Sequence, residues 1–120
     1  MVAAPLLECS FLIPLRRDAE LSDGEAHSRK KWNWLTSSLE EIFGGWTRAP
    51  GKYEGVWKSS KTGRTITDES YRYEIAIPEN QIDSLRLLLA EACAVFKQQV
   101  IYLAVAGRVE FIPGPTHDPP

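Results

Sequence analysis

Apolar and polar residues alternate near the N-terminus of the chain. This spacing of two predicts a half-buried β-strand over residues 7–15. A clearer alternation runs through residues 64–77, where one face carries Tyr71, Tyr73, Ile75 and Ile77. We expect these two strands to be neighbours in one sheet, with their large apolar residues facing a common core.

Two segments have the three-to-four-residue spacing of amphipathic helices. The first, residues 25–43, follows Ser22 and Glu25, which have the spacing of a capping box, and ends at Gly44-Gly45. The second, residues 79–98, follows Pro78 and has the strongest helical pattern in the chain. Its apolar face is predicted to carry Ile82, Leu85, Leu88, Leu89, Ala92, Val95 and Phe96.

Shorter strands complete the predicted fold. Residues 53–60 are expected to pair with 64–77 through a turn at 61–63, residues 99–106 form a last strand, and 108–112 form a short extension after Gly107. The order is β-α-β-β-α-β. It predicts an α+β, two-layer ferredoxin-like sandwich, a four-stranded antiparallel sheet with two helices on one face. Residues 1–112 would form a single domain, followed by a proline-rich mobile tail, 113–120.

Composition places the chain among ordinary globular domains, with 43% hydrophobic and 25% charged residues. No run is long and apolar enough for a membrane helix, and the N-terminus lacks the basic region of a signal peptide. Cys9 and Cys93 are the only cysteines and form no C-x-x-C pair. We therefore expect a cytoplasmic protein with two buried thiols, a Cys9–Cys93 disulfide being the alternative.

No catalytic motif, metal site or cofactor site is predicted. His27 opens a predicted helix, and His117 lies in the tail. His27 is expected to be a solvated first-turn residue, with a general base or a ligand as the alternative. Asp68, Glu69 and Glu74 offer carboxylates, but side chains of adjacent strand residues point to opposite faces. Asp68 and Glu69 therefore should not share one site unless the strand bulges.

The segment from Trp46 to Arg64 combines basic and aromatic residues. Eight basic and three acidic residues lie between His27 and Arg64, against six and thirteen elsewhere. A small anionic ligand would suit this segment, whereas the acidic overall charge argues against nucleic acid. Trp34 should point outward, because Trp32 occupies the core stripe. The candidate ligand or partner surface comprises Trp34, Arg48, Trp57, Arg64, Arg72, Glu74 and Tyr102.

A family resemblance rests on a few glycines and aromatic residues. The run Phe43-Gly44-Gly45-Trp46-Thr47, then Gly55-Val56-Trp57, Gly63 and Glu69-Ser70, resembles an uncharacterised bacterial family of small α+β domains with a Phe-Gly-Gly-x-Thr … Gly-x-Trp … Gly signature. The resemblance extends over residues 12–112 and implies the fold class. It implies no catalytic residue.

Three functions remain open on these grounds. The main hypothesis is a non-enzymatic homo-oligomeric binding or regulatory module, most simply a homodimer formed through the open sheet face or the hairpin edge. That face is expected to carry Leu12, Ala76, Tyr102 and Ala104 beside charged residues. The second is a small enzyme of the dimeric α+β-barrel type with a pocket on the open face. The third is an adaptor for an anionic partner or a nucleic acid that uses the basic hairpin, residues 46–64.

Overall fold

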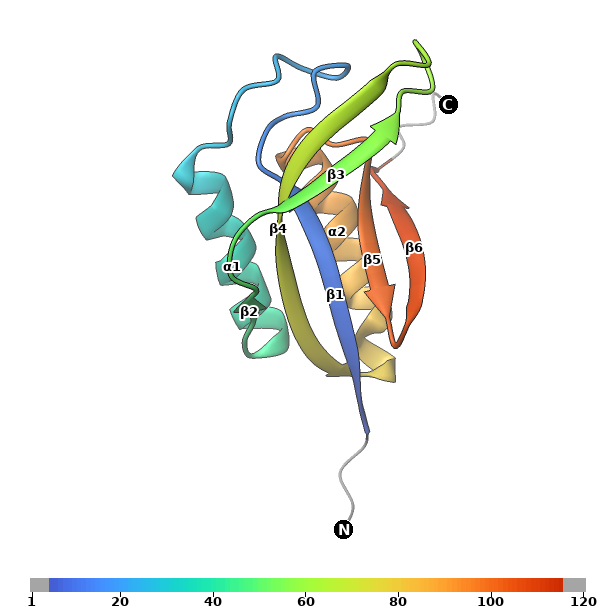
Figure 1. Cartoon of the computed structure of the whole chain (residues 1–120). Helices are drawn as coiled ribbons and strands as arrows, with labels where there is room; N and C mark the ends of the chain where they lie inside the picture. The colour runs from blue at the N-terminus through green and yellow to red at the C-terminus, as the bar shows by residue number, and fades with distance from the viewer. Residues whose placement is uncertain (1–4, 116–120) are drawn as a thin grey trace, which may run out of the picture.

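The computed structural model of the chain describes residues 5–115, and Figure 1 shows a sheet packed against two helices. The elements are β1 (Leu6–Pro14), α1 (Arg29–Phe43), β2 (Thr47–Arg48), β3 (Tyr53–Lys58), β4 (Thr65–Pro78), the 3-10 turn η1 (Glu79–Gln81), α2 (Ile82–Val95), β5 (Val100–Val105) and β6 (Arg108–Pro113). The α+β class is confirmed.

The sheet is built around β1, which pairs with β4 on one edge and β5 on the other. Its order is β2-β4-β1-β5-β6, with β3 also pairing with β4, and every pair is antiparallel. The prediction of four strands is wrong, because this sheet has six. The two additional strands are β2, which follows the Gly44-Gly45 helix stop, and β6. A turn at Ala106 and Gly107, both with positive φ, connects β5 to β6.

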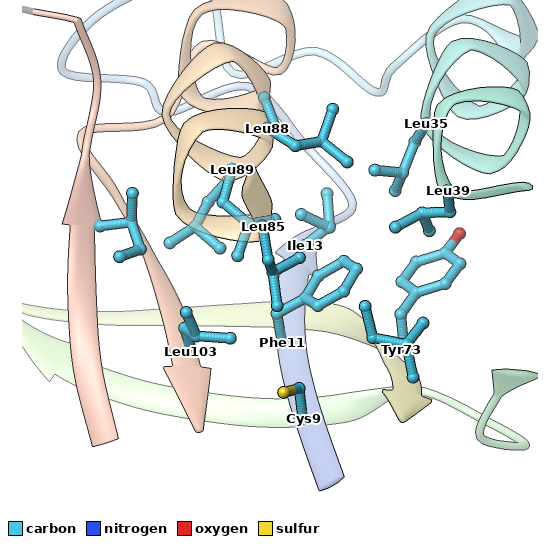
Figure 2. Close-up of a cluster of buried hydrophobic side chains, with 14 of the residues drawn as sticks. Cys9, Phe11, Ile13, Leu35, Leu39, Tyr73, Leu85, Leu88, Leu89 and Leu103 are labelled. Atoms are coloured by element: carbon cyan, nitrogen blue, oxygen red, sulfur yellow. The ribbon is translucent and has the colours of Figure 1, made fainter. Parts of the chain in front are cut away.

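One face of the sheet forms the core. Phe11 lies opposite Tyr73 on β4 and Leu103 on β5, and Cys9 lies opposite Ile75. All five side chains are buried. Figure 2 shows leucines of both helices pointing at these strands: Leu35 and Leu39 from α1, and Leu85, Leu88 and Leu89 from α2. The two helices therefore cover the same face, and the opposite face stays open.

Helix α1 begins four residues later than predicted. Asp23 accepts a hydrogen bond from the backbone N–H of Glu25 through its side chain (3.0 Å), so the segment closes a local turn instead of a capping box. Ser28 occupies the N-cap position without a side-chain cap bond. The predicted C-terminus is confirmed. Gly44 has φ +86°, and its N–H bonds to the carbonyl of Glu40 (2.9 Å).

The C-terminal end of the sheet extends one residue further than expected. Pro113, assigned from the sequence to a mobile tail, is the last residue of β6. Gly114 then packs close to Cys93, so that a Cβ there would lie 3.3 Å from the Cys93 side chain. The rest of the predicted tail, residues 116–120 with His117, lies outside the described residues.

Leu89 and Leu87 give a matched test of the α2 face. Leu89 is fully buried between the helix and the sheet, whereas Leu87 is 73% exposed. We expect Leu89→Ala to lower the free energy of unfolding by about 2–5 kcal/mol. Leu87→Ala on the same helix should change it by less than about 0.5 kcal/mol. Urea melts of both variants measure the difference, and equal losses would contradict the assigned face.

Candidate functional site

A cleft of about 610 Å³ opens where the β3–β4 hairpin extends beyond the end of β1. Figure 1 shows this hairpin projecting past β1, with the long loop between β1 and α1 on the same side of the molecule. The loop contributes residues from Pro14 to Glu20 together with Gly24 and Ala26, and Gln98 closes part of the floor. The hairpin contributes Lys52, Glu54, Trp57, Ile66, Thr67, Asp68 and Glu69.

Polar contacts fasten the loop wall of the cleft. Glu20 accepts a hydrogen bond from the Ser59 hydroxyl at the hairpin turn. Gln99, just before β5, donates to Asp18 (2.9 Å) and to Glu20 (3.4 Å). Glu20 thus connects the loop to the hairpin and to the start of β5, which fixes the width of the cleft.

The position of the Asp68 carboxylate on the hairpin wall depends on two residues of β3, Trp57 and Gly55. The indole N–H of Trp57 donates to Asp68 Oδ2 over 3.1 Å. Gly55 is directly opposite Asp68 on the paired strand, and a Cβ at Gly55 would lie 2.8 Å from Asp68 Oδ1. The absence of a side chain at Gly55 therefore leaves the space that Asp68 occupies.

Glu69 and Asp68 both line the cleft, contrary to the expectation that they would not share a site. Their side chains do leave the strand on opposite faces, because Asp68 and Glu69 are consecutive residues of β4. They reach the same cleft because β1 ends opposite Ser70, which leaves the edge of β4 before that residue open. No bulge is needed.

His27 lies beneath the loop wall and is buried, not solvated as the sequence suggested. Its Nε2 is 2.8 Å from the carbonyl oxygen of Pro14, and its ring packs edge-on against Phe96 and Trp32. Because Nε2 donates to that carbonyl, Nδ1 is the unprotonated nitrogen. Burial lowers the pKa of His27, and nearby Lys31 and Arg17 lower it further against the opposing hydrogen bond to Pro14.

The residues proposed from the sequence as a ligand or partner surface do not converge. Only Trp57 lines the cleft. Arg48 stacks over the ring of Tyr71, 4.4 Å from its centroid, and Arg72 is 3.2 Å from Glu74. Arg64 lies just after the turn at the tip of the hairpin. Arg48, Arg64 and Arg72 therefore do not share one ligand site, and the β3–β4 side of the cleft carries Lys52 beside Glu54, Asp68 and Glu69.

Two further aromatic predictions are resolved by their neighbours. Trp34 is partly buried instead of pointing outward, because its large indole reaches Phe96 (ring centroids 6.3 Å apart), as Trp32 also does. Tyr102 lies on the open face of β5 and packs edge-on against Phe111 of β6. The contact between Tyr102 and Phe111 was not expected, because the sequence predicted residues 108–112 only as a short extension.

A smaller groove of about 400 Å³ lies at the end of α1, away from the cleft. Glu8 and Glu74 line it together with Trp46 and the Gly44-Gly45 stop. Glu74 is already paired with Arg72. The groove is therefore a weaker candidate than the cleft.

The part of the chain from residue 5 to 115 contains no group of three or more side chains able to hold a metal ion. In the same residues no helix has the length and apolar character needed to cross a membrane. Both cysteines are buried and free, and burial raises the pKa of Cys93 to about 11.

Comparison with known proteins gives a match by fold alone. No family model matches the sequence, and no curated protein does. Among solved structures, a phage SAM lyase in complex with S-methyl-5′-thioadenosine superposes with a TM-score of 0.71 at 15% identity, covering 95% of this chain and 94% of that one. A phage SAM lyase in the apo state superposes at 0.64 with 13% identity, covering 98% and 97%.

This finding corrects the main functional prediction. From the sequence we favoured a non-enzymatic homo-oligomeric module, but the fold matched over nearly the whole chain is that of an enzyme. The enzyme alternative fits better. Its expected location also changes, because the larger cleft lies at the hairpin and the β1–α1 loop instead of on the open sheet face.

The buried His27 predicts an acid-sensitive fold. Its pKa in the folded state lies below its ordinary value of 6.5, so the unfolded chain binds the proton more readily. The contribution of His27 to stability is complete above about pH 6.5 and is lost as the pH falls below it. Urea melts between about pH 5 and 7.5 should show this decline. His27→Phe should flatten it, and an unchanged slope in that variant would contradict the assignment.

Proposed function

We propose that the chain is a small enzyme that binds S-adenosylmethionine in the hairpin cleft and releases S-methyl-5′-thioadenosine. The observation that carries the proposal is the full-length likeness to a lyase of this substrate, with its nucleoside bound. The proposal retains the small ligand expected from the sequence but not its anionic character. We interpret the fold as an enlarged ferredoxin-like sandwich and propose the cytoplasm as its location, where two free thiols stay reduced.

The cleft suits such a ligand in size and in the groups that line it. Its volume of about 610 Å³ falls within the ~300–1,000 Å³ range of small-molecule sites. Trp57 offers an indole for a purine ring to contact. Glu54, Asp68 and Glu69 suit the sulfonium cation and the hydroxyl groups of the ribose, while Arg16 and Lys52 suit the carboxylate of the amino-acid part.

Release of S-methyl-5′-thioadenosine requires mainly that the enzyme bind and orient its substrate. Release of S-methyl-5′-thioadenosine breaks the bond between the sulfonium sulfur and the four-carbon amino-acid fragment, and the electron pair goes to sulfur. The leaving group is a neutral thioether, so no acid must protonate it. Without added water, the fragment either loses a proton or closes on its own carboxylate. A cleft that fixes the substrate conformation therefore supplies the central requirement.

Incubation with S-adenosylmethionine tests the proposal. We expect the purified protein to release S-methyl-5′-thioadenosine, measured by liquid chromatography, faster than a heat-inactivated sample. Glu69→Gln removes one cleft charge and should slow release at least about ten-fold, because a carboxylate in the cleft lining attracts the positively charged sulfonium. Glu91→Gln, an exposed change on α2, should leave the rate unaltered. Release equal to the heated control would contradict the proposal.

We also propose that the chain associates with itself through the open sheet face, most simply as a homodimer. The exposed apolar residues there include Val109 and Phe111 on β6, beside Tyr102. Burial of an exposed apolar patch against a second copy is favourable, because it removes apolar surface from water. The patch therefore supports an interface between copies.

Phe111 gives a direct test of self-association, because it is 61% exposed. Sedimentation at micromolar concentration should give a mass above the 13.5 kDa of one chain. Phe111→Lys should return it to one chain, while Leu87→Lys on the helix side should not. A single-chain mass for the unaltered protein across a range of salt would defeat this proposal and leave the cleft untouched.

A further inference from the structure

We propose that Asp68 gives the cleft its selectivity for a cationic ligand, and that Gly55 and Trp57 position it for that task. The inference rests on the proposed function and adds to it a specificity-determining residue with its two positioning residues. It begins from a segment that the sequence singled out, Gly55-Val56-Trp57, whose residue types the enzyme assignment alone does not explain.

A hydrogen bond holds one oxygen of the Asp68 carboxylate, and the other occupies space that only a glycine leaves free. Oδ2 accepts the hydrogen bond of the Trp57 indole at 3.1 Å. Oδ1 lies over the backbone of Gly55, where any larger residue would place a Cβ 2.8 Å away. Gly55 and Trp57, two residues apart on β3, therefore determine where the Asp68 carboxylate of β4 lies.

The donor that holds Asp68 is a neutral indole, so this hydrogen bond does not neutralise the charge of the carboxylate. Within residues 5–115, the ion pairs are Arg17–Asp23, Arg72–Glu74, Arg86–Asp83 and Arg86–Glu110, and none involves Asp68. Asp68 is also partly buried in the cleft wall. A fixed and unpaired carboxylate in a cleft attracts a cation more strongly than the same group in open solvent.

Glu54 and Glu69 add two exposed carboxylates to the lining of the cleft, on the strand face opposite Asp68. They lie directly opposite each other on paired strands and both line the cleft. Like charges in this position destabilise a sheet unless something separates or neutralises them. Because both side chains are exposed, water and salt screen part of this repulsion, and a sulfonium or ammonium centre in the cleft would reduce it further.

A matched pair of ligands isolates the effect of charge. Sinefungin carries an amine that is protonated where S-adenosylmethionine has its sulfonium, and S-adenosylhomocysteine has a neutral sulfur in a molecule of similar size. By calorimetry, Asp68→Asn should weaken sinefungin binding at least about ten-fold. It should change S-adenosylhomocysteine binding less than about two-fold, because the amide keeps the shape and can still accept the indole bond.

Variants of the two positioning residues complete the test. Trp57→Phe keeps a ring but loses the N–H, and Gly55→Ala displaces the carboxylate, so both should reduce the preference for sinefungin. Glu91→Gln is the control. The indole N–H signal of Trp57, measured by NMR without ligand, should shift in Asp68→Ala.

The outcomes separate this inference from the proposed function. Equal weakening of both ligands in Asp68→Asn, or weakening of neither, would overturn the selectivity assigned to Asp68 while leaving a nucleoside site in place. An unshifted indole signal in Asp68→Ala would overturn the positioning by Trp57. Binding of neither ligand to the unaltered protein would contradict the proposed function and this inference with it.

Discussion

The structure depends on the pairing of β1 with strands on both of its edges. Residues Leu6–Pro14 lie opposite Pro78–Ser70 of β4, and Phe11 also meets Leu103 of β5. This register places Cys9, Phe11 and Ile13 on the single face that both helices cover. Because the side-chain period of a strand is two, a shift of one residue would expose all of them.

The same pairing creates the cleft. The β1 ladder stops at Pro14, and one further backbone bond joins the N–H of Leu15 to the carbonyl of Glu69 (2.9 Å). Strand β4 starts at Thr65, so its residues before Ser70 have β3 on one side and no strand on the other. The β1–α1 loop fills part of that space, and the remainder is the candidate site.

The sequence predicted the elements that bury one face, because burial of one face requires apolar residues at regular spacing. The alternation around Phe11 and Tyr73, the leucine face of α2 and the glycine stop at Gly44 are all local signals, and each is confirmed. The start of α1 was wrong because Asp23 bonds locally to Glu25, a choice that the Ser22–Glu25 spacing does not reveal. Strand β6 was predicted one residue too short and only as an extension, because it is an edge strand with a single buried residue, Ile112, and so has no clear alternation.

The site was harder to predict, because it is made by contacts between distant segments. Glu20 contacts Ser59 and Gln99 only after the loop folds against the hairpin, and part of the burial of His27 comes from Phe96, 69 positions further along the chain. One local signal was available. Gly55 and Trp57 are two residues apart on a strand and hence on one face, but their common partner, Asp68, follows only from the hairpin register.

The central claim is that the cleft between the β1–α1 loop and the β3–β4 hairpin is a nucleoside site. A crystal structure of the protein grown with S-methyl-5′-thioadenosine tests it most directly. The account predicts the molecule in this cleft, in contact with Trp57 and Asp68. Nucleoside bound in the groove beside Trp46, or on the open face beside Tyr102, with the hairpin cleft empty, would contradict it.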